Sequence, residues 1–287
     1  AEAQWTSCGA ANRYCELKLA LPRLHQLRDL LVHAQFSDVD EESEDPVGSR
    51  GLHLTMEKLE DSVQASTLEI RKGLCDMQAF MWNGSYRILQ ADFKERLFDL
   101  ILAIIVEHEM DIDHLLVENI ILHMEATHSP EIVAQCIRCF CDPTTPGLEA
   151  ADCEPWKVDS WALSRPEVAR FFARKLFSLH QVWRLDEFMA SWEDVVPSVF
   201  GIEVDLKLVE DFAVVKPQAT GDLLTLVDVD TLPVPLRQRC RELFRIKPRW
   251  KLAEISPFVA SVIPPFQKVE EAIKPFVRLS EDEADTR

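Results

Sequence analysis

The stretch Ala79-Phe-Met-Trp-Asn83-Gly84-Ser-Tyr-Arg-Ile-Leu89 decides how this sequence folds. It places Asn-Gly between two apolar and aromatic runs, and this pair suits a type I′ turn because both central residues there have positive φ. The stretch therefore predicts a β-hairpin. Apolar residues recur at helical spacing on both sides of it, over residues 52–63, 70–77 and 93–104. Ser66 and Glu69 predict a capping box at the start of the second helix.

Two short helices followed by a hairpin and a closing helix, here the one over 93–104, is the order of elements in a winged-helix domain, and it recurs loosely along the chain. An amphipathic segment over 112–124, a helix from Ser129-Pro130-Glu131 to Phe140 and a candidate wing over 156–161 form the second set. A helix through 168–179 follows, with a capping box expected at Ser164 and Glu167.

The third set has helices over 185–192 and 204–212, then a hairpin of 213–215 and 223–227. Pro233 and Pro235 begin a helix toward Phe244, and two more helices are expected near 250–263 and 266–278. We therefore expect a mainly α fold with short β-hairpins, arranged as three tandem winged-helix domains at 51–110, 111–182 and 183–279.

Acidic runs mark the borders of this organisation. Residues 38–45 hold six acids in eight positions, so we expect an acidic, solvated linker over 37–50 that follows a connecting helix at 21–36. A second acidic run lies in the tail, 280–287. The chain begins at Ala1, and we expect it to be part of a longer protein.

Composition limits the classes of function. The 287 residues hold 31 Lys and Arg against 49 Asp and Glu, a net charge of −18, so any contact with nucleic acid must come from a local patch. Only 8 glycines are present, and no glycine-rich phosphate-binding loop occurs. No apolar run reaches the roughly 18 residues that a membrane span needs, so no membrane partner is expected. The eight dispersed cysteines are typical of reduced thiols in a nuclear or cytosolic protein.

No catalytic motif is recognisable, so we expect no enzyme activity and no cofactor. The best metal candidate is Cys136-x-x-Cys139-x-Cys141, with Cys153 and His123 or His128 nearby. Thiolates at this spacing suit zinc, but Cys136 and Cys139 fall on a predicted helix, where cysteine behaves as a small buried hydrophobe. We favour the core interpretation and predict no metal site.

The basic stretch at 237–251 is the candidate binding site. Seven Lys and Arg against Glu242 give a charge of +6 within fifteen residues. Arg237, Arg241 and Arg245 are four residues apart, so they share one helix face beside a core-directed stripe at Leu236, Cys240 and Phe244. We predict a DNA-binding patch that consists of Arg237, Arg241, Arg245, Lys247 and Arg249. The alternative is that these groups pair with the abundant acids of this chain or of a partner.

Trp82 and Tyr86, which flank the first turn, are a weaker candidate. An exposed wing of this kind can enter a nucleic-acid groove, but large aromatic side chains more often pack against their own domain. We therefore expect Trp82 and Tyr86 to be packed.

A series of short motifs resembles one known family, the Dcc-one family of sister chromatid cohesion proteins. The motifs follow the same order as in that family and cover nearly the whole chain. They are Tyr14-Cys-Glu-Leu-Lys18, Pro22-Arg-Leu-His-Gln-Leu-Arg-Asp-Leu-Leu31, Leu59-Glu-Asp-Ser-Val-Gln-Ala-Ser-Thr-Leu-Glu-Ile70, Gly84-Ser-Tyr-Arg-Ile-Leu89, Asp230-Thr-Leu-Pro233, Leu243-Phe244, Trp250 and Ile255-Ser-Pro-Phe-Val259.

The resemblance implies a nuclear, non-catalytic subunit of an alternative replication factor C-like clamp loader. In that family the amino-terminal part forms a β-barrel module with Ctf-eighteen and Ctf-eight, so residues 1–20 would be a remnant of the barrel. Three winged helices then contact DNA and the catalytic part of DNA polymerase epsilon. The complex acts on the sliding clamp PCNA and supports cohesion, so this subunit meets PCNA only indirectly.

One departure from the family pattern shifts the expected DNA contact. The family is densely basic after its Tyr-x-Glu-Leu motif, whereas Lys18 to Arg28 holds only three Lys or Arg. This leaves the 237–249 patch as the better candidate, with weak, nonspecific DNA binding by the chain alone. The alternative function is a winged-helix scaffold for protein interactions in another assembly, without nucleic-acid contact.

Overall fold

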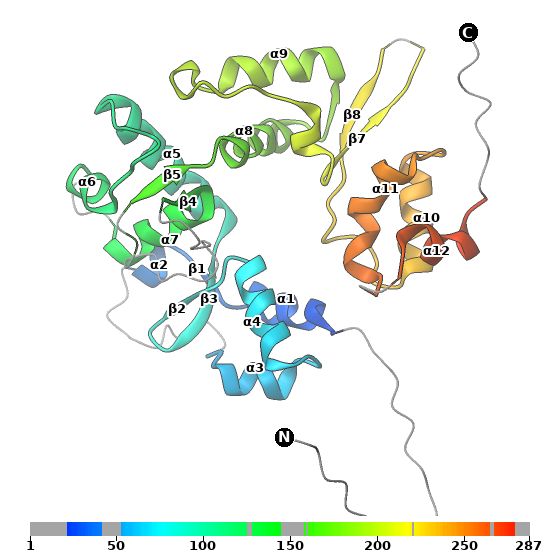
Figure 1. The fold of residues 1–287 in the computed structure, drawn as a ribbon, viewed down its shortest axis with the longest axis horizontal. Coiled ribbons are helices and arrows are strands. Elements are labelled where there is room, and N and C mark those ends of the chain that lie inside the picture. Colours follow the sequence, from blue (N-terminus) through cyan, green and yellow to red (C-terminus); the bar gives the residue numbers. More distant parts are fainter. Residues whose placement is uncertain are drawn as a thin grey trace, which may run out of the picture.

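The computed structural model describes residues 22–41, 53–124, 128–144, 158, 160–219, 221–264 and 267–278. Within these residues the fold is mainly helical with three small sheets (Figure 1), which confirms the predicted mixture of helices and short hairpins. No helix in these ranges is both long and apolar enough to cross a membrane. The expected barrel remnant at 1–20 and the acidic tail at 280–287 lie outside the described residues.

The first unit, residues 22–90, contains the hairpin predicted from Asn83-Gly84. Trp82 lies opposite Ser85, and the φ angles of Asn83 and Gly84 are 48° and 76°, so the hairpin turn is confirmed. The predicted capping box of Ser66 is also present. β3 is the central strand, antiparallel to β2 and parallel to β1. The elements are α1 (Leu24–Val32), β1 (Gln35–Phe36), α2 (Asp38–Glu41), α3 (Met56–Ser62), α4 (Thr67–Asp76), β2 (Phe80–Trp82) and β3 (Ser85–Leu89).

The start of the predicted acidic linker is folded rather than solvated. Residues 38–41 form α2, and the Asp40 carboxylate accepts a hydrogen bond from Ser37 N at 3.0 Å. Asp40 also pairs at 3.0 Å with Arg87, which is only 6% exposed. A buried guanidinium requires a nearby counter-charge, and Asp40 supplies it. Residues 42–50 of the predicted linker lie outside the described ranges.

The second unit, residues 91–164, has a similar order of elements. Leu115 forms a single bridge to Trp161, so β5 lies between Leu115 and β4. The helix expected over 112–124 is wrong for its first turn, because the Asp111 carboxylate accepts the Asp113 N–H at 3.0 Å and holds a turn there. The elements are α5 (Ala91–Glu107), α6 (Val117–Leu122), α7 (Pro130–Phe140), β4 (Cys141–Pro143) and β5 (Trp161–Leu163).

The third unit, residues 165–227, repeats the order again, with β8 between β6 and β7. Ser164 makes no side-chain cap bond, so the capping box expected there is wrong. The helix expected over 204–212 is a single 3-10 turn, η3. The elements are α8 (Arg165–Leu179), β6 (Val182–Arg184), α9 (Leu185–Val195), η2 (Ser198–Phe200), η3 (Leu206–Val209), β7 (Ala213–Lys216) and β8 (Leu223–Leu226).

The C-terminal helices, residues 228–278, form a separate apolar core against Val214 and Val227 of the third unit. In Figure 1 the units follow one another around the molecule, and the C-terminal helices come round toward α1. Arg28 of α1 forms an ion pair with Asp230, which joins these two parts of the fold. The elements are α10 (Leu236–Ile246), α11 (Leu252–Val259), η4 (Ala260–Val262), α12 (Val269–Ile273) and η5 (Lys274–Phe276).

Candidate nucleic-acid interface

The basic stretch forms α10, which begins after Pro235 and ends just before Lys247 and Pro248. Proline suits a helix start because its φ is already near the helical value. Cys240 and Leu243 are buried against α11 and α12, whereas Arg237, Arg241 and Arg245 are exposed. The predicted exposure of Arg237, Arg241 and Arg245 is therefore confirmed, but the predicted core stripe is right only for Cys240, because Leu236 and Phe244 are partly buried and Leu243 is buried instead.

Arg239 is the exception among the arginines of α10, because it is 4% exposed. Its guanidinium donates to the carbonyl oxygens of Pro233 and Phe258, each at 2.8 Å, and to that of Leu232 at 3.2 Å. Burial, and after it the nearby Arg28, lowers the pKa of Arg239. Arg239 thus joins the loop before α10 to the end of α11 and offers nothing to a ligand.

The five predicted site residues do not share one environment. Arg245 donates a hydrogen bond to Glu242 of the same helix at 2.8 Å. The side chain of Lys247 is only 11% exposed, and its Nζ lies 2.7 Å from Glu254 and 5.6 Å from the ring centre of Trp250. Within the described part of the chain, no ion pair engages the three remaining residues, which are exposed: Arg237, Arg241 and Arg249.

The ion pair with Glu254 fixes the position of Lys247. Partial burial acts to raise the pKa of Glu254, but hydrogen bonds from Lys247 Nζ and Lys251 N outweigh it, so the pKa lies below its usual value. The carboxylate stays charged near neutral pH and fixes Lys247 beside α11. Lys247 therefore serves the fold of the C-terminal helices.

A groove runs along the exposed face of α10. Its volume is about 520 Å³, and Arg237 and Arg241 lie on it together with Cys240, Phe244, Pro275 and Phe276. Phe276 is 44% exposed, so an aromatic surface lies beside two exposed guanidinium groups. Such a surface combines an apolar contact with anion recognition.

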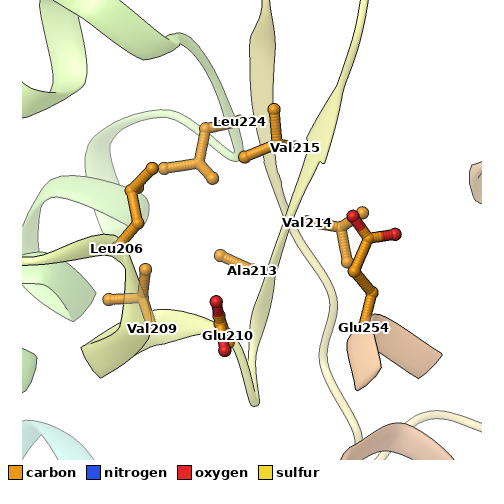
Figure 2. Close-up of a pocket in the computed structure, with 8 residues that line it drawn as sticks. All are labelled: Leu206, Val209, Glu210, Ala213, Val214, Val215, Leu224 and Glu254. Carbon is orange, nitrogen blue, oxygen red and sulfur yellow. The ribbon is translucent and has the colours of Figure 1, made fainter. Parts of the chain in front are cut away.

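A second cavity lies between the third unit and α11 (Figure 2). It has a volume of about 100 Å³ and is lined mostly by aliphatic side chains from η3, β7 and β8. Ligand sites usually occupy about 300–1,000 Å³, so this space is small for a substrate. Its two carboxylates are Glu210 and Glu254, and Glu254 is already engaged by Lys247.

The cysteine cluster belongs to the core. Cys136, Cys139 and Cys141 are at most 5% exposed and lie in the apolar cluster of the second unit, which confirms the core interpretation. Burial is the main reason that the pKa of each thiol is raised. Cys153 lies outside the described ranges. His123 stacks on His108, with ring centres 3.6 Å apart.

The aromatic residues of the first hairpin are packed as predicted. The Trp82 ring lies edge-on to Phe36, with centres 5.0 Å apart, and Tyr86 packs against the core of α1, α3 and α4. Neither is a free wing for a nucleic-acid groove.

The sequence analysis did not predict the joint between α7 and the first unit, which is a set of hydrogen bonds. Gln135 donates to the Gln78 carbonyl at 2.9 Å, and Arg138 donates to the Ala79 carbonyl at 2.8 Å. Gln78 in turn donates to the Cys139 carbonyl at 3.2 Å and has a positive φ of 55°. Gln135 and Arg138, the two polar residues in the otherwise apolar run 132–140, were the available signals.

A family model described as sister chromatid cohesion protein Dcc1 matches residues 1–259. The sister chromatid cohesion protein DCC1 of Xenopus tropicalis is 25% identical over 272 residues, which cover 95% of this chain and 66% of that protein. The human protein of the same name is 25% identical over 251 residues, covering 88% and 61%.

The protein of that name from Saccharomyces cerevisiae is 23% identical over 235 residues, covering 78% of this chain and 58% of the yeast protein. The chain therefore spans between 58% and 66% of the length of these three relatives. Because the family model matches most of the sequence, the chain belongs to the family of the sister chromatid cohesion protein Dcc1.

Proposed function

We propose that the chain is a non-catalytic, nuclear subunit of an alternative clamp loader that acts in DNA replication and sister chromatid cohesion. Family membership supports the role in cohesion. The proposed partners are homologues of Ctf-eighteen and Ctf-eight and the catalytic part of DNA polymerase epsilon, with PCNA reached through them.

We propose three winged helices with boundaries shifted from those expected above. Each unit opens with a helix, continues with a strand or an isolated bridge and then with further short helices or 3-10 turns, and ends in two strands of which the last is central. This shared order supports one domain each at 22–90, 91–164 and 165–227. In this division α1 and β1 open the first domain, and α5 opens the second instead of closing the first. The C-terminal helices then form an addition to the third winged helix.

The DNA contact is proposed for α10 on one observation. Arg237 and Arg241 are exposed on one helix face and, within the described ranges, have no ion-pair partner, although the chain carries a net charge of −18. The chain has enough acidic residues to pair with every arginine. Two exposed guanidinium groups that have no acidic partner in the described ranges therefore favour binding of an external anion. Arg249 lies beyond the end of α10 and extends the patch.

The second unit supplies little to this contact. Its α7 corresponds to the helix that winged-helix proteins most often place in the DNA groove. Eight of its eleven residues are buried, and Arg138 is held by the Ala79 carbonyl. This supports a spacer role for the second unit.

The test is a comparison of affinities for duplex DNA at low salt. Arg237→Glu with Arg241→Glu should weaken binding roughly tenfold, equally for unrelated sequences, because phosphate contacts carry no sequence information. The control is Arg96→Glu with Arg165→Glu, which makes the same charge change at two exposed arginines already paired with Asp38 and Asp113. Equal weakening in both variants would show a bulk charge effect and remove the α10 patch.

The alternative function is a protein-interaction scaffold without nucleic-acid contact. Its support is that Arg245 and Lys247, two of the five predicted site residues, already form ion pairs within the C-terminal helices. Failure of the unaltered chain to bind DNA even at low salt would favour this function.

A further inference from the structure

The groove on α10 carries positive charge and apolar surface together. Arg237 and Arg241 stand one helical turn apart, about 6 Å along the axis, and Phe276 lies beside them. Phe276 belongs to η5, the last element of the described chain. The groove is therefore formed partly by the residues that lead into the acidic tail.

The tail has the complementary chemistry. Residues 279–287 read Leu-Ser-Glu-Asp-Glu-Ala-Asp-Thr-Arg, with four acids against one arginine. Glu281, Asp282 and Glu283 are consecutive, so this short stretch carries more carboxylates than there are guanidinium groups to pair with. Carboxylates bind guanidinium with short, charge-assisted hydrogen bonds.

The tether places this segment within reach. Glu281 comes five positions after Phe276, and five extended residue steps span up to about 17 Å, more than the distance between the two arginines along α10. A short tether also gives an effective concentration on the order of millimolar, so individually weak ion pairs suffice.

We propose that the acidic segment Glu281–Asp285 binds across Arg237 and Arg241 and competes there with the phosphates of DNA. The inference rests on the proposed function, because it regulates the same arginines. The tail acts as a built-in phosphate mimic, which weakens DNA binding by the isolated chain without abolishing it. The acidic residues 42–45 and the tail of a second copy are the alternative occupants.

A charge-preserving variant tests the contact directly and without DNA. Arg237→Lys or Arg241→Lys places an amine in the groove, and a carbodiimide joins an amine to a carboxylate that touches it. After digestion, mass spectrometry should identify an amide from the new lysine to residues 281–285 within one chain. The native Lys247–Glu254 pair, at 2.7 Å, is the internal positive control.

Arg249→Lys is the matched negative control, because Arg249 is exposed but is not part of the groove. We expect a lysine at position 237 or 241 to form an amide with the tail at least about fivefold more often than a lysine at position 249. The reason is that the proposed contact holds the tail beside the groove. Equal frequencies from all three sites would overturn the inference. Amides to residues 42–45, or amides between two chains in a mixed isotope-labelled sample, would also overturn it.

A second measurement links the contact to DNA. Glu281→Gln, Asp282→Asn, Glu283→Gln and Asp285→Asn together should raise duplex affinity about three- to tenfold. The control removes the same charge from four exposed acids elsewhere: Glu118, Glu193, Asp194 and Glu203. Cross-links without any DNA binding would leave the tail contact standing and overturn the DNA proposal. DNA binding by α10 without cross-links would overturn the tail contact alone.

Discussion

Arg239 is the residue that determines how the C-terminal helices are held together. Its guanidinium donates to carbonyls from the loop before α10 and from α11, two segments that lack a shared strand or helix. Arg239→Met keeps the apolar stem but leaves those buried carbonyls without donors. We expect a loss of about 3 kcal/mol in the free energy of unfolding of this part of the chain.

Denaturant unfolding followed by tryptophan fluorescence measures this loss, with Trp250 as the reporter within the C-terminal helices. Arg237→Met is the control, since it removes an exposed arginine from the same helix and should change the unfolding free energy by less than about 0.5 kcal/mol. Similar losses in both variants would mean that Arg239 contributes only as any arginine of α10 does.

The burial of Arg239 could have been anticipated from the sequence. It lies three residues after Leu236 and four before Leu243, on the same stripe as these two apolar residues. Arg237 and Arg241 lie off that stripe, and their exposure was predicted correctly. Periodicity in the sequence predicts which helix face a side chain lies on. Only the structure shows the carbonyl groups whose hydrogen bonds offset the cost of burying the Arg239 guanidinium.

Among the elements, the joint between α7 and the turn before β2 has the clearest consequence. Gln135→Met with Arg138→Met removes the donors to the Gln78 and Ala79 carbonyls. Two partly buried hydrogen bonds should be worth about 2 kcal/mol of unfolding free energy, and amide hydrogen exchange should quicken at residues 78–82. DNA affinity should stay unchanged, since α7 takes no part in the proposed contact.

Glu131→Gln is the matched control, because Glu131 is exposed on the same helix. Unchanged exchange in the double variant would show that the first and second units do not depend on this joint. A loss of DNA affinity in a variant that remains folded would contradict the spacer role of the second unit.

Predictions that rest on a few adjacent residues were right at two places and wrong at two others, the capping box at Ser164 and the helix over 204–212. The hairpin at Asn83-Gly84 and the capping box at Ser66 depend on a few adjacent residues, and both are confirmed. The segment over 204–212 is apolar enough for a helix, but the Asp205 carboxylate accepts the Lys207 N–H at 3.0 Å and only a 3-10 turn forms.

At the scale of the whole molecule, one core joins the first two units. Phe36, Phe80 and Leu89 of the first unit pack in the same cluster as Phe93 and Phe98 of α5. Contacts between such distant segments leave no periodic signal, which is why the sequence alone could not place a boundary between β3 and α5. The boundaries of the winged helices stay a proposal that depends on strand order.

The most direct test of the central proposal is the salt dependence of duplex binding by the unaltered chain. If Arg237, Arg241 and Arg249 each neutralise a phosphate, the logarithm of the association constant should fall with the logarithm of salt concentration with a slope of about −2.7. Arg237→Glu with Arg241→Glu should flatten the slope to about −0.9. An identical slope in the unaltered chain and the double variant would contradict the proposal and assign these arginines to protein contacts.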